Sequence, residues 1–356
     1  MKEIIVVKVG TNTLTANGSN LNNDLIANLV KQLAKLHEQG YQVVLVTSGA
    51  VAAGKEALYL SNGDNTIVKR QVYASVGQAR LMHKYENFFA EHGLNIGQAL
   101  LTHDDFCHRA RYDNALQTLH GLLDSGIIPV INENDVVTIN ELSFGDNDVL
   151  AATTAIAIGA SKLIFLTNQE GVMTDNPNKN SDARLIDKVE DAKEIFSVIS
   201  DGLPSSGGIG GMFSKVNAAR IATSAGVATW VASGLRPANI SDIVQGKKIG
   251  TYFVPKKTTL TAKSRWILCA KNASTGVYVD AGAVKALTDR KSLLMVGIHK
   301  IKGFFEAKQI IEVIDDTDRI VGYGVVNYDS ESLKAALDNP RSLDKEIIHA
   351  DNFRLI

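Results

Sequence analysis

IIVVKVGTNTL, residues 4–14, places a lysine inside an apolar run and follows that run at once with a glycine. A near-continuous apolar run of this length is typical of a strand buried on both faces, as in a parallel sheet. A charged side chain in such a strand is costly unless it finds a counter-charge. Gly10 would let backbone N–H groups approach a phosphate closely. Lys8 and Gly10 therefore indicate a phosphate site, with an edge-strand lysine that reaches solvent as the alternative.

Five further apolar runs of strand length follow in the first 250 residues, and amphipathic stretches separate them. The clearest of these stretches has apolar residues at helical spacing from 25 to 36, with cap candidates at 22–24 and Gly40 as the stop. Strands that alternate with helices in this way predict an α/β domain, a three-layer αβα sandwich with a mainly parallel central sheet. The five runs are 42–46, 96–101, 127–131, 163–166 and 229–232.

The composition of the sequence changes at Pro255, where the polar and basic stretch PKKTTLTAKSR begins. Short β-like pieces separated by Gly and Asp turns follow it, and this spacing predicts a small β-rich barrel or sandwich. We expect a domain of residues 1–256, a linker of residues 257–272 and a β-rich domain of residues 273–356. The expected strands of the β-rich domain are 276–279, 293–296, 310–314 and 321–326.

Composition narrows the class of protein. There are 37 Lys and Arg against 38 Asp and Glu, so no basic excess points to a polyanion partner. Cys107 and Cys269 lie far apart, which indicates neither a disulfide framework nor a zinc site. Lys8 interrupts the N-terminal apolar stretch too soon for a signal-peptide core, and the longest weakly polar run, Val149–Ala160, is too short to span a bilayer. We therefore expect a cytoplasmic protein.

Two more strand ends carry signals for anion binding. VTSGAVAAG, residues 46–54, ends a buried strand at Ser48 and Gly49 and starts a helix of small residues. Backbone amides at a helix N-terminus form an anion site, although small residues also allow close packing of a helix on the sheet. SSGGIGGMFSK, residues 205–215, sets Lys215 just after four glycines. It matches neither a Walker A loop nor a dinucleotide-binding fingerprint, but a glycine turn with a lysine suits phosphate, with a surface linker as the alternative.

Acidic and amide side chains crowd two nearby stretches, VINEND at 130–135 and GDND at 145–148. Such a group could recognise an amino group, coordinate a cation or orient lysines, whereas turn and cap roles are the alternative. A further strand ends in LTNQEGV, residues 166–172, where a nucleotide base or ribose could bind. His103, Cys107 and His108 lack paired ligand spacing, so we expect no metal site there.

Taken together and in this order, these motifs resemble the amino-acid kinase superfamily, and within it the glutamate 5-kinase family. The stretch KRQVYASVGQARL, residues 69–81, belongs to the same resemblance, which covers nearly all of residues 1–250. The tail, with VDAGAVKAL at 279–287, resembles the PUA domain that many bacterial members carry. The resemblance implies phosphorylation of the γ-carboxylate of L-glutamate by ATP with Mg²⁺, which is the first step of proline biosynthesis. It also implies a homo-oligomer, a dimer or tetramer, with proline as feedback inhibitor.

The resemblance assigns roles to single residues. Lys8 and Lys215 would contact the ATP phosphates, and Asp146 would hold both lysines in place. L-glutamate would bind Ser48, Gly49, Asp135 and Asn147. The family usually has Asp where this chain has Asn168 and often Thr where it has Ile209, and both differences lie on the nucleotide side. The ATP site would be lined by Lys8, Gly10, Thr167, Asn168, Ile209, Gly210, Gly211, Met212, Phe213, Ser214 and Lys215.

Other interpretations remain open at the level of sequence. Acetylglutamate kinase and aspartokinase belong to the same superfamily, but the first lacks a PUA-like tail and the second usually carries longer regulatory domains. RNA binding by the tail is a different class of function. Residues 274–356 hold 11 Lys and Arg against 13 Asp and Glu, so a basic footprint is missing there except for a patch around 290–302.

Overall fold

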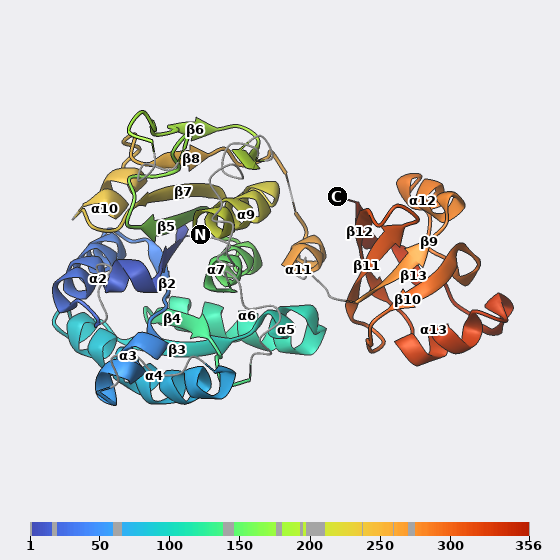
Figure 1. Cartoon of the computed structure of the whole chain (residues 1–356), viewed down its shortest axis with the longest axis horizontal. Coiled ribbons are helices and arrows are strands. Elements are labelled where there is room, and N and C mark those ends of the chain that lie inside the picture. Colours follow the sequence, from blue (N-terminus) through green and yellow to red (C-terminus); the bar gives the residue numbers. More distant parts are fainter. Residues whose placement is uncertain are drawn as a thin grey trace. The chain divides into compact units, whose positions relative to one another are not determined.

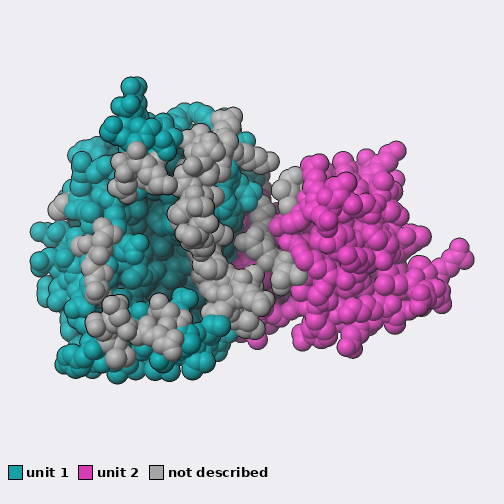
Figure 2. Space-filling model, viewed as in Figure 1, with its two compact units in different colours: residues 1–102, 117–258 teal, residues 103–116, 259–356 magenta. Residues whose placement is uncertain are grey.

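The structure is a computed structural model of the 356-residue chain, and its described residues form two compact units, which Figure 2 colours separately. The first unit comprises residues 1–102 and 117–258, and the second comprises 103–116 and 259–356. The side chain of Asp146 lies outside the description. The described residues are 2–15, 20–59, 66–137, 146–175, 180–192, 195–196, 211–236, 238–258, 260–269 and 275–355.

An eight-stranded sheet forms the centre of the first unit, in the order β3-β4-β2-β1-β5-β7-β8-β6 (Figure 1). Neighbouring strands from β3 to β7 are parallel, and β8 is antiparallel to β7. All six predicted strands are present, three of them with the predicted bounds. The strands are β1 Ile4–Val9, β2 Gln42–Val46, β3 Ile96–Leu101, β4 Ile128–Glu133, β5 Lys162–Thr167, β6 Lys188–Val189, β7 Ala228–Ser233 and β8 Thr251–Phe253.

Helices cover both faces of this sheet, so the predicted αβα sandwich is confirmed. The helix expected over 25–36 is α2, which Asn22 caps by accepting a hydrogen bond from the Leu25 N–H, and Gly40 follows its end at φ +92°. The helices of the first unit are α1 Thr11–Leu14, α2 Asn23–Glu38, α3 Ala50–Ala57, α4 Ile67–Ala90, α7 Asp146–Ala157, α9 Gly211–Ser224 and α10 Asn239–Val244. Helix α6, Arg109–Asp124, has residues in both units.

The alternation of side chains along β1 decides what Lys8 faces. Ile5, Val7 and Val9 belong to the apolar core that α2 and α4 also build. Successive side chains of a strand point to opposite faces, so Lys8 lies on the other side of the sheet. Helices α7 and α9 cover that side (Figure 1). The lysine is therefore directed between these two helices and away from solvent.

The second unit contains a five-stranded sheet in the order β10-β9-β11-β12-β13. Three of the four predicted strands are present, but the prediction for 293–296 is wrong, because a 3₁₀ turn at Met295–Gly297 occupies the second half of that run. Polar residues concealed β10 and β13 from the sequence analysis. The strands are β9 Gly276–Val279, β10 Ile298–Lys302, β11 Ile310–Asp315, β12 Ile320–Val326 and β13 Ile348–Leu355, and the helices are α5 His103–Cys107, α11 Ala262–Cys269, α12 Ala281–Thr288 and α13 Ser330–Ala336.

Helix α11 lies inside the segment that was expected to be a linker. Its Trp266 is buried and donates a hydrogen bond from Nε1 to the Phe106 carbonyl at 3.0 Å, within the second unit. The proposed domain bounds stay a prediction. In the part of the chain that the structure describes, we find no helix with both the length and the apolar character of a transmembrane span.

Candidate active site

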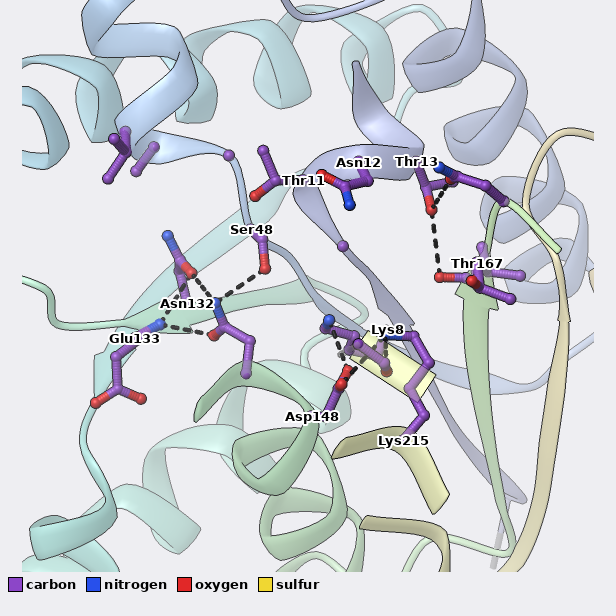
Figure 3. A pocket seen from close by; sticks show the side chains of 18 of the residues that line it. Lys8, Thr11, Asn12, Thr13, Ser48, Asn132, Glu133, Asp148, Thr167 and Lys215 are labelled. Carbon is purple, nitrogen blue, oxygen red and sulfur yellow. Dashed lines mark hydrogen bonds and ion pairs between the residues drawn. The ribbon is translucent and has the colours of Figure 1, made fainter. Parts of the chain in front are cut away.

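A cavity of about 510 Å³ lies at the carboxyl ends of β1, β2, β4 and β5 (Figure 3). In open parallel sheets, ligands bind at this edge, where the strand order reverses on the two sides of the first strand. Eleven of the residues predicted from the sequence line the cavity. They are Lys8, Gly10, Ser48, Gly49, Asp135, Asn147, Thr167, Asn168, Gly211, Met212 and Lys215.

Two lysines from distant parts of the chain share one carboxylate at the inner wall of the cavity. Lys8 Nζ lies 2.7 Å from Asp148 Oδ1, and Lys215 Nζ lies 3.1 Å from Asp148 Oδ2. Ser214 Oγ donates a further hydrogen bond to Asp148 Oδ2 at 2.9 Å. All four residues are less than a tenth exposed. The three charged groups carry a net charge of about +1 when all are ionised, which suits an anion.

The surroundings shift the proton affinity of this cluster. Burial lowers the pKa of Lys8 and the charge of Lys215 adds to the effect, whereas Asp148 opposes it. Burial alone would raise the pKa of Asp148, but the two lysine charges and the hydrogen bonds from Lys8 and Ser214 together hold that pKa below its usual range. Asp148 therefore stays ionised at neutral pH and is the group that favours protonation of Lys8.

Asp148 is the carboxylate that contacts both lysines, and it was not singled out from the sequence, where the resemblance implied Asp146 in that role. The side chain of Asp146 lies outside the part of the chain that the structure describes. Asp148 shares a buried helix face with Ala151, Ala152 and Ala155. The residues between them, Leu150, Thr153 and Thr154, are buried as well, so no helical periodicity in the sequence distinguishes Asp148 from its neighbours.

A second polar cluster lies beside the lysines, at the ends of β2 and β4 and the start of α7 (Figure 3). Asn147 Nδ2 donates to Ser48 Oγ at 2.9 Å and to Asn132 Oδ1 at 3.1 Å. The backbone N–H of Glu133 donates to Asn147 Oδ1 at 3.1 Å. The predicted neighbourhood of VTSG, VINEND and GDND is therefore realised in space, with Ser48 and Asn147 in direct contact.

The small residues after Ser48 lie in two different surroundings. Gly49 lines the cavity and adopts φ +104° at the start of α3, a backbone conformation that L side chains rarely adopt. Gly54, at the other end of the motif, permits close helix packing instead, since an added Cβ would lie 1.9 Å from the Tyr73 carbonyl oxygen of α4. At Gly77 of α4, an added Cβ would likewise lie 1.8 Å from the carbonyl oxygen of Ala50 of α3.

Asp135 lines the cavity together with Arg70 of α4. Burial raises the pKa of the Asp135 carboxyl, and the charge of Arg70 only partly offsets this. A carboxylate whose ionised form is disfavoured in this way gains from a positively charged ligand. Arg70 belongs to the KRQVYASVGQARL stretch but had not been singled out from the sequence.

The nucleotide side of the cavity is described only in part. Asn168 Oδ1 accepts a hydrogen bond from Thr13 Oγ1 at 2.9 Å, which links the end of β5 to α1. Phe213 packs against Phe196, with ring centroids 5.1 Å apart, and is not among the residues lining the cavity. Ile209 and Gly210, both predicted to contact ATP, lie outside the described residues.

Comparison with sequence families matches both parts of the chain. The amino acid kinase family matches residues 3–233, and the PUA domain matches residues 276–344. Among solved structures, the chain is similar to the UMP kinase from Bacillus anthracis, at 15% identity and a TM-score of 0.50. That match covers 73% of this chain and 98% of the other. At this identity it shows the fold alone.

Several relatives named glutamate 5-kinase match almost the whole chain. The protein from Photobacterium profundum is 41% identical over 333 residues, which is 93% of this chain and 88% of the relative. The protein from Hydrogenovibrio crunogenus is 38% identical over 360 residues, covering 98% and 96% of the two chains. The protein from Synechococcus elongatus is 42% identical over 336 residues, covering 94% and 92%.

Proposed function

This chain belongs to the amino acid kinase family and, within it, to the glutamate 5-kinases, and we propose that it transfers a phosphoryl group from ATP to the γ-carboxylate of L-glutamate. This reaction is the first step of proline biosynthesis. The observation that carries the residue-level proposal is the shared cavity. A cluster of two lysines around Asp148 and a separate polar cluster around Ser48 and Asn147 both open into it.

The lysine cluster is proposed to bind and neutralise the phosphoryl group that is transferred. Charge spreads over the equatorial oxygens of that group in the transition state, so catalysis depends on positioning and on cationic donors. Lys8 and Lys215 supply two such donors, and both contact the carboxylate of Asp148. Gly10 leaves the space beside Lys8 open, since an added Cβ at residue 10 would lie 3.3 Å from Lys8 Nζ. The holding role is proposed for Asp148 in place of Asp146, because Asp148 contacts both lysines.

The polar cluster and Asp135 are proposed to bind glutamate. Ser48 and Gly49 present hydroxyl and backbone groups suited to a carboxylate, and Asn147 lies beside them and holds the Ser48 hydroxyl. Asp135, whose pKa is raised by burial, is suited to the α-ammonium group. The γ-carboxylate is already ionised at neutral pH, so the reaction needs no general base.

ATP use follows from membership of the amino acid kinase family, and Mg²⁺ is proposed to enter as part of the MgATP substrate. Mg²⁺ is commonly held by substrate phosphates and waters rather than by a cage of side chains. The described residues fit this mode, because they include no group of three or more His, Cys, Asp or Glu side chains that could hold a metal ion. Thr167, Asn168 and the segment from Ile209 to Lys215 are proposed to line the nucleotide site.

Proline is proposed as a feedback inhibitor that competes at the glutamate site. It carries a carboxylate next to an ammonium group, as glutamate does, and so it can use Ser48 and Asp135 in the same way. We also propose that the protein acts in the cytoplasm as a homo-oligomer, a dimer or tetramer. RNA binding by the PUA domain is a weaker alternative, because that domain lacks a basic excess.

The direct test traps the acyl phosphate with hydroxylamine. The purified chain is incubated with MgATP and, in parallel, with L-glutamate, N-acetylglutamate or L-aspartate. We expect a hydroxamate signal with L-glutamate alone. A signal with N-acetylglutamate or L-aspartate in its place would reassign the substrate, and the absence of any signal with glutamate would refute the proposal.

A further inference from the structure

Four side chains form one row of hydrogen bonds that begins in the proposed glutamate site and ends behind it, and we call this row the amide network: Ser48, Asn147, Asn132 and Gln78. Asn147 Nδ2 donates to both Ser48 Oγ and Asn132 Oδ1, at 2.9 Å and 3.1 Å. Asn132 Nδ2 in turn donates to Gln78 Oε1 at 2.8 Å. The row thus runs from the cavity wall at the end of β2, through the end of β4, to helix α4.

A single backbone group fixes the orientation of the two asparagine amides. The N–H of Glu133 donates to Asn132 Oδ1 at 2.9 Å and to Asn147 Oδ1 at 3.1 Å. A backbone N–H can only donate, so both contacting atoms must be carbonyl oxygens. If either amide turned over, its NH₂ group would face this N–H and a second like pair would form between Asn132 and Asn147. The assignment of oxygen and nitrogen therefore follows from the network itself.

The orientation of Asn147 determines what Ser48 can offer to a ligand. A hydroxyl has one hydrogen to donate and two lone pairs that accept. Asn147 occupies a lone pair of Ser48 Oγ, and no described residue accepts the hydroxyl hydrogen. Ser48 lines the cavity. Its hydrogen is therefore left for a ligand acceptor. A carboxylate can accept this hydrogen, whereas an ammonium group could only donate to the remaining lone pair and would leave the hydrogen unpaired. This position therefore favours a carboxylate over an ammonium group.

Gln78 closes the far end of the network at a cost. Its Nε2 is buried and has no hydrogen-bond partner among the described residues. An unpaired buried donor is unfavourable. Turning the Gln78 amide over would bring its NH₂ group against the NH₂ group of Asn132, so the network holds Gln78 with its oxygen inward. Gln78 does not line the cavity, and Asn132 is only 1% exposed with its oxygen already shared by two donors.

We propose that Asn132 and Gln78 are positioning residues for glutamate. Together with the Glu133 N–H, they orient Asn147 so that Ser48 donates its hydrogen to a carboxylate of the substrate. The carboxyl group of Asp135, elsewhere in the same cavity, favours an ammonium group. Ser48 and Asp135 together therefore set the direction in which the amino acid binds. The inference rests on the proposed assignment of Ser48 and Asn147 to glutamate.

A double-mutant cycle on the full chain tests this inference, with steady-state kinetics in glutamate and in MgATP. We expect Ser48→Ala to raise the KM for glutamate roughly ten- to a hundredfold, the usual loss for a hydrogen bond to a charged group. Asn132→Ala alone should raise it on the order of tenfold, through coupling to Ser48. In the Ser48→Ala background, Asn132→Ala should have little further effect, because the group it orients is gone. The KM for ATP should stay unchanged throughout.

Gln78→Leu provides a second test of the network. Gln78 does not line the cavity, and the substitution removes the oxygen that accepts a hydrogen bond from Asn132. It should raise the KM for glutamate in the wild-type background only. Tyr85→Phe is the matched control, because it deletes a buried 2.7 Å hydrogen bond to Thr47, the neighbour of Ser48, without touching the network. It should lower the melting temperature and leave the KM for glutamate unchanged.

Two results would overturn the inference. One is that the effects of Ser48→Ala and of Asn132→Ala or Gln78→Leu multiply in the double variants. The other is that the KM for ATP rises as much as the KM for glutamate, which indicates a general loss of structure. Absence of glutamate turnover in the wild-type protein is a separate outcome, which would refute the proposed function itself.

Discussion

Replacing Asp148 by Asn tests the lysine cluster most directly. The substitution keeps the shape of the side chain and removes the one carboxylate that Lys8 and Lys215 share at 2.7 Å and 3.1 Å. At an effective dielectric constant of about 20, each contact of roughly 3 Å is worth about 5–6 kcal/mol of Coulomb attraction before desolvation. The variant would leave two buried ammonium groups beside each other without that compensation.

Loss of a proton from one lysine is the way we expect the variant to relieve this repulsion. Burial already lowers the pKa of Lys8 and Asp148 opposes that shift, so Asp148→Asn lowers the pKa of Lys8 further. A neutral lysine no longer neutralises the phosphoryl group, and the loss of one such donor typically reduces kcat by about 10²–10³. The protonated form is the active one, so activity should recover partly at low pH and be lost as the pH rises through the lowered pKa.

The assay is kcat for glutamate-dependent ADP release, measured from about pH 6.5 to pH 8.5 for wild type and variant. Ser214→Ala is the matched control, since it removes one hydrogen bond of 2.9 Å from an uncharged donor to the same carboxylate and leaves both ion pairs. A hydrogen bond to a charged group contributes about 1.5–3 kcal/mol, so the control can lose up to about a hundredfold, but it should not show the recovery at low pH, because both lysines keep their counter-charge. An Asp148→Asn enzyme within about threefold of wild type would refute the reasoning, as would a larger loss that is the same at every pH.

Further variants test other parts of the site. Lys8→Ala and Lys215→Ala should fold normally and lose at least about 10²–10³ in kcat, and wild-type-like turnover in either would contradict their roles. Asp135→Asn should raise the melting temperature of the ligand-free protein at neutral pH and also raise the KM for glutamate. The melting temperature should rise because burial raises the pKa of Asp135 in the folded state, so the folded protein loses stability as the pH rises and this carboxyl ionises. An asparagine does not ionise and avoids that loss. A lower melting temperature would show that Asp135 is stabilised by contacts other than those described. Gly54→Ala should unfold the α3–α4 pair, because its Cβ would lie 1.9 Å from the Tyr73 carbonyl oxygen; soluble protein with a wild-type melting temperature would contradict this.

The strands of the first unit could be predicted from sequence because they are buried on both faces. Val6, Val44 and Leu163 are fully buried, and continuous apolar runs have no other common explanation at this length. The second unit was harder, because its strands are partly solvent-facing. β10 reads IHKIK and β13 reads IHADNFRL, so their polar residues hide the strand pattern. The 293–296 run is apolar yet not extended, and Leu294 and Val296 within it are in fact exposed.

The site was predictable to the level of motifs but not of single partners. The sequence placed GDND beside the lysines, yet only the turn of α7 decides which acidic side chain faces Lys8. The hydrogen bonds of the amide network could not be predicted from the sequence either. Gln78 is one polar residue in a long amphipathic helix, and nothing in its neighbours marks it as a partner of Asn132. Such contacts depend on the spacing of β4 and α4 in three dimensions.

The central position of β1 has a consequence for the order in which the protein can assemble. β1 is made before the other strands of its sheet, yet it pairs with β2 on one side and with β5 on the other. Val7, for example, lies opposite Leu45 and Ile164. Contacts between residues so far apart in sequence slow folding, because a long loop must close before they form. A nascent chain that ends before residue 162 therefore leaves one edge of β1 unpaired, and Lys8 meets its counter-charge only after most of the first unit has emerged.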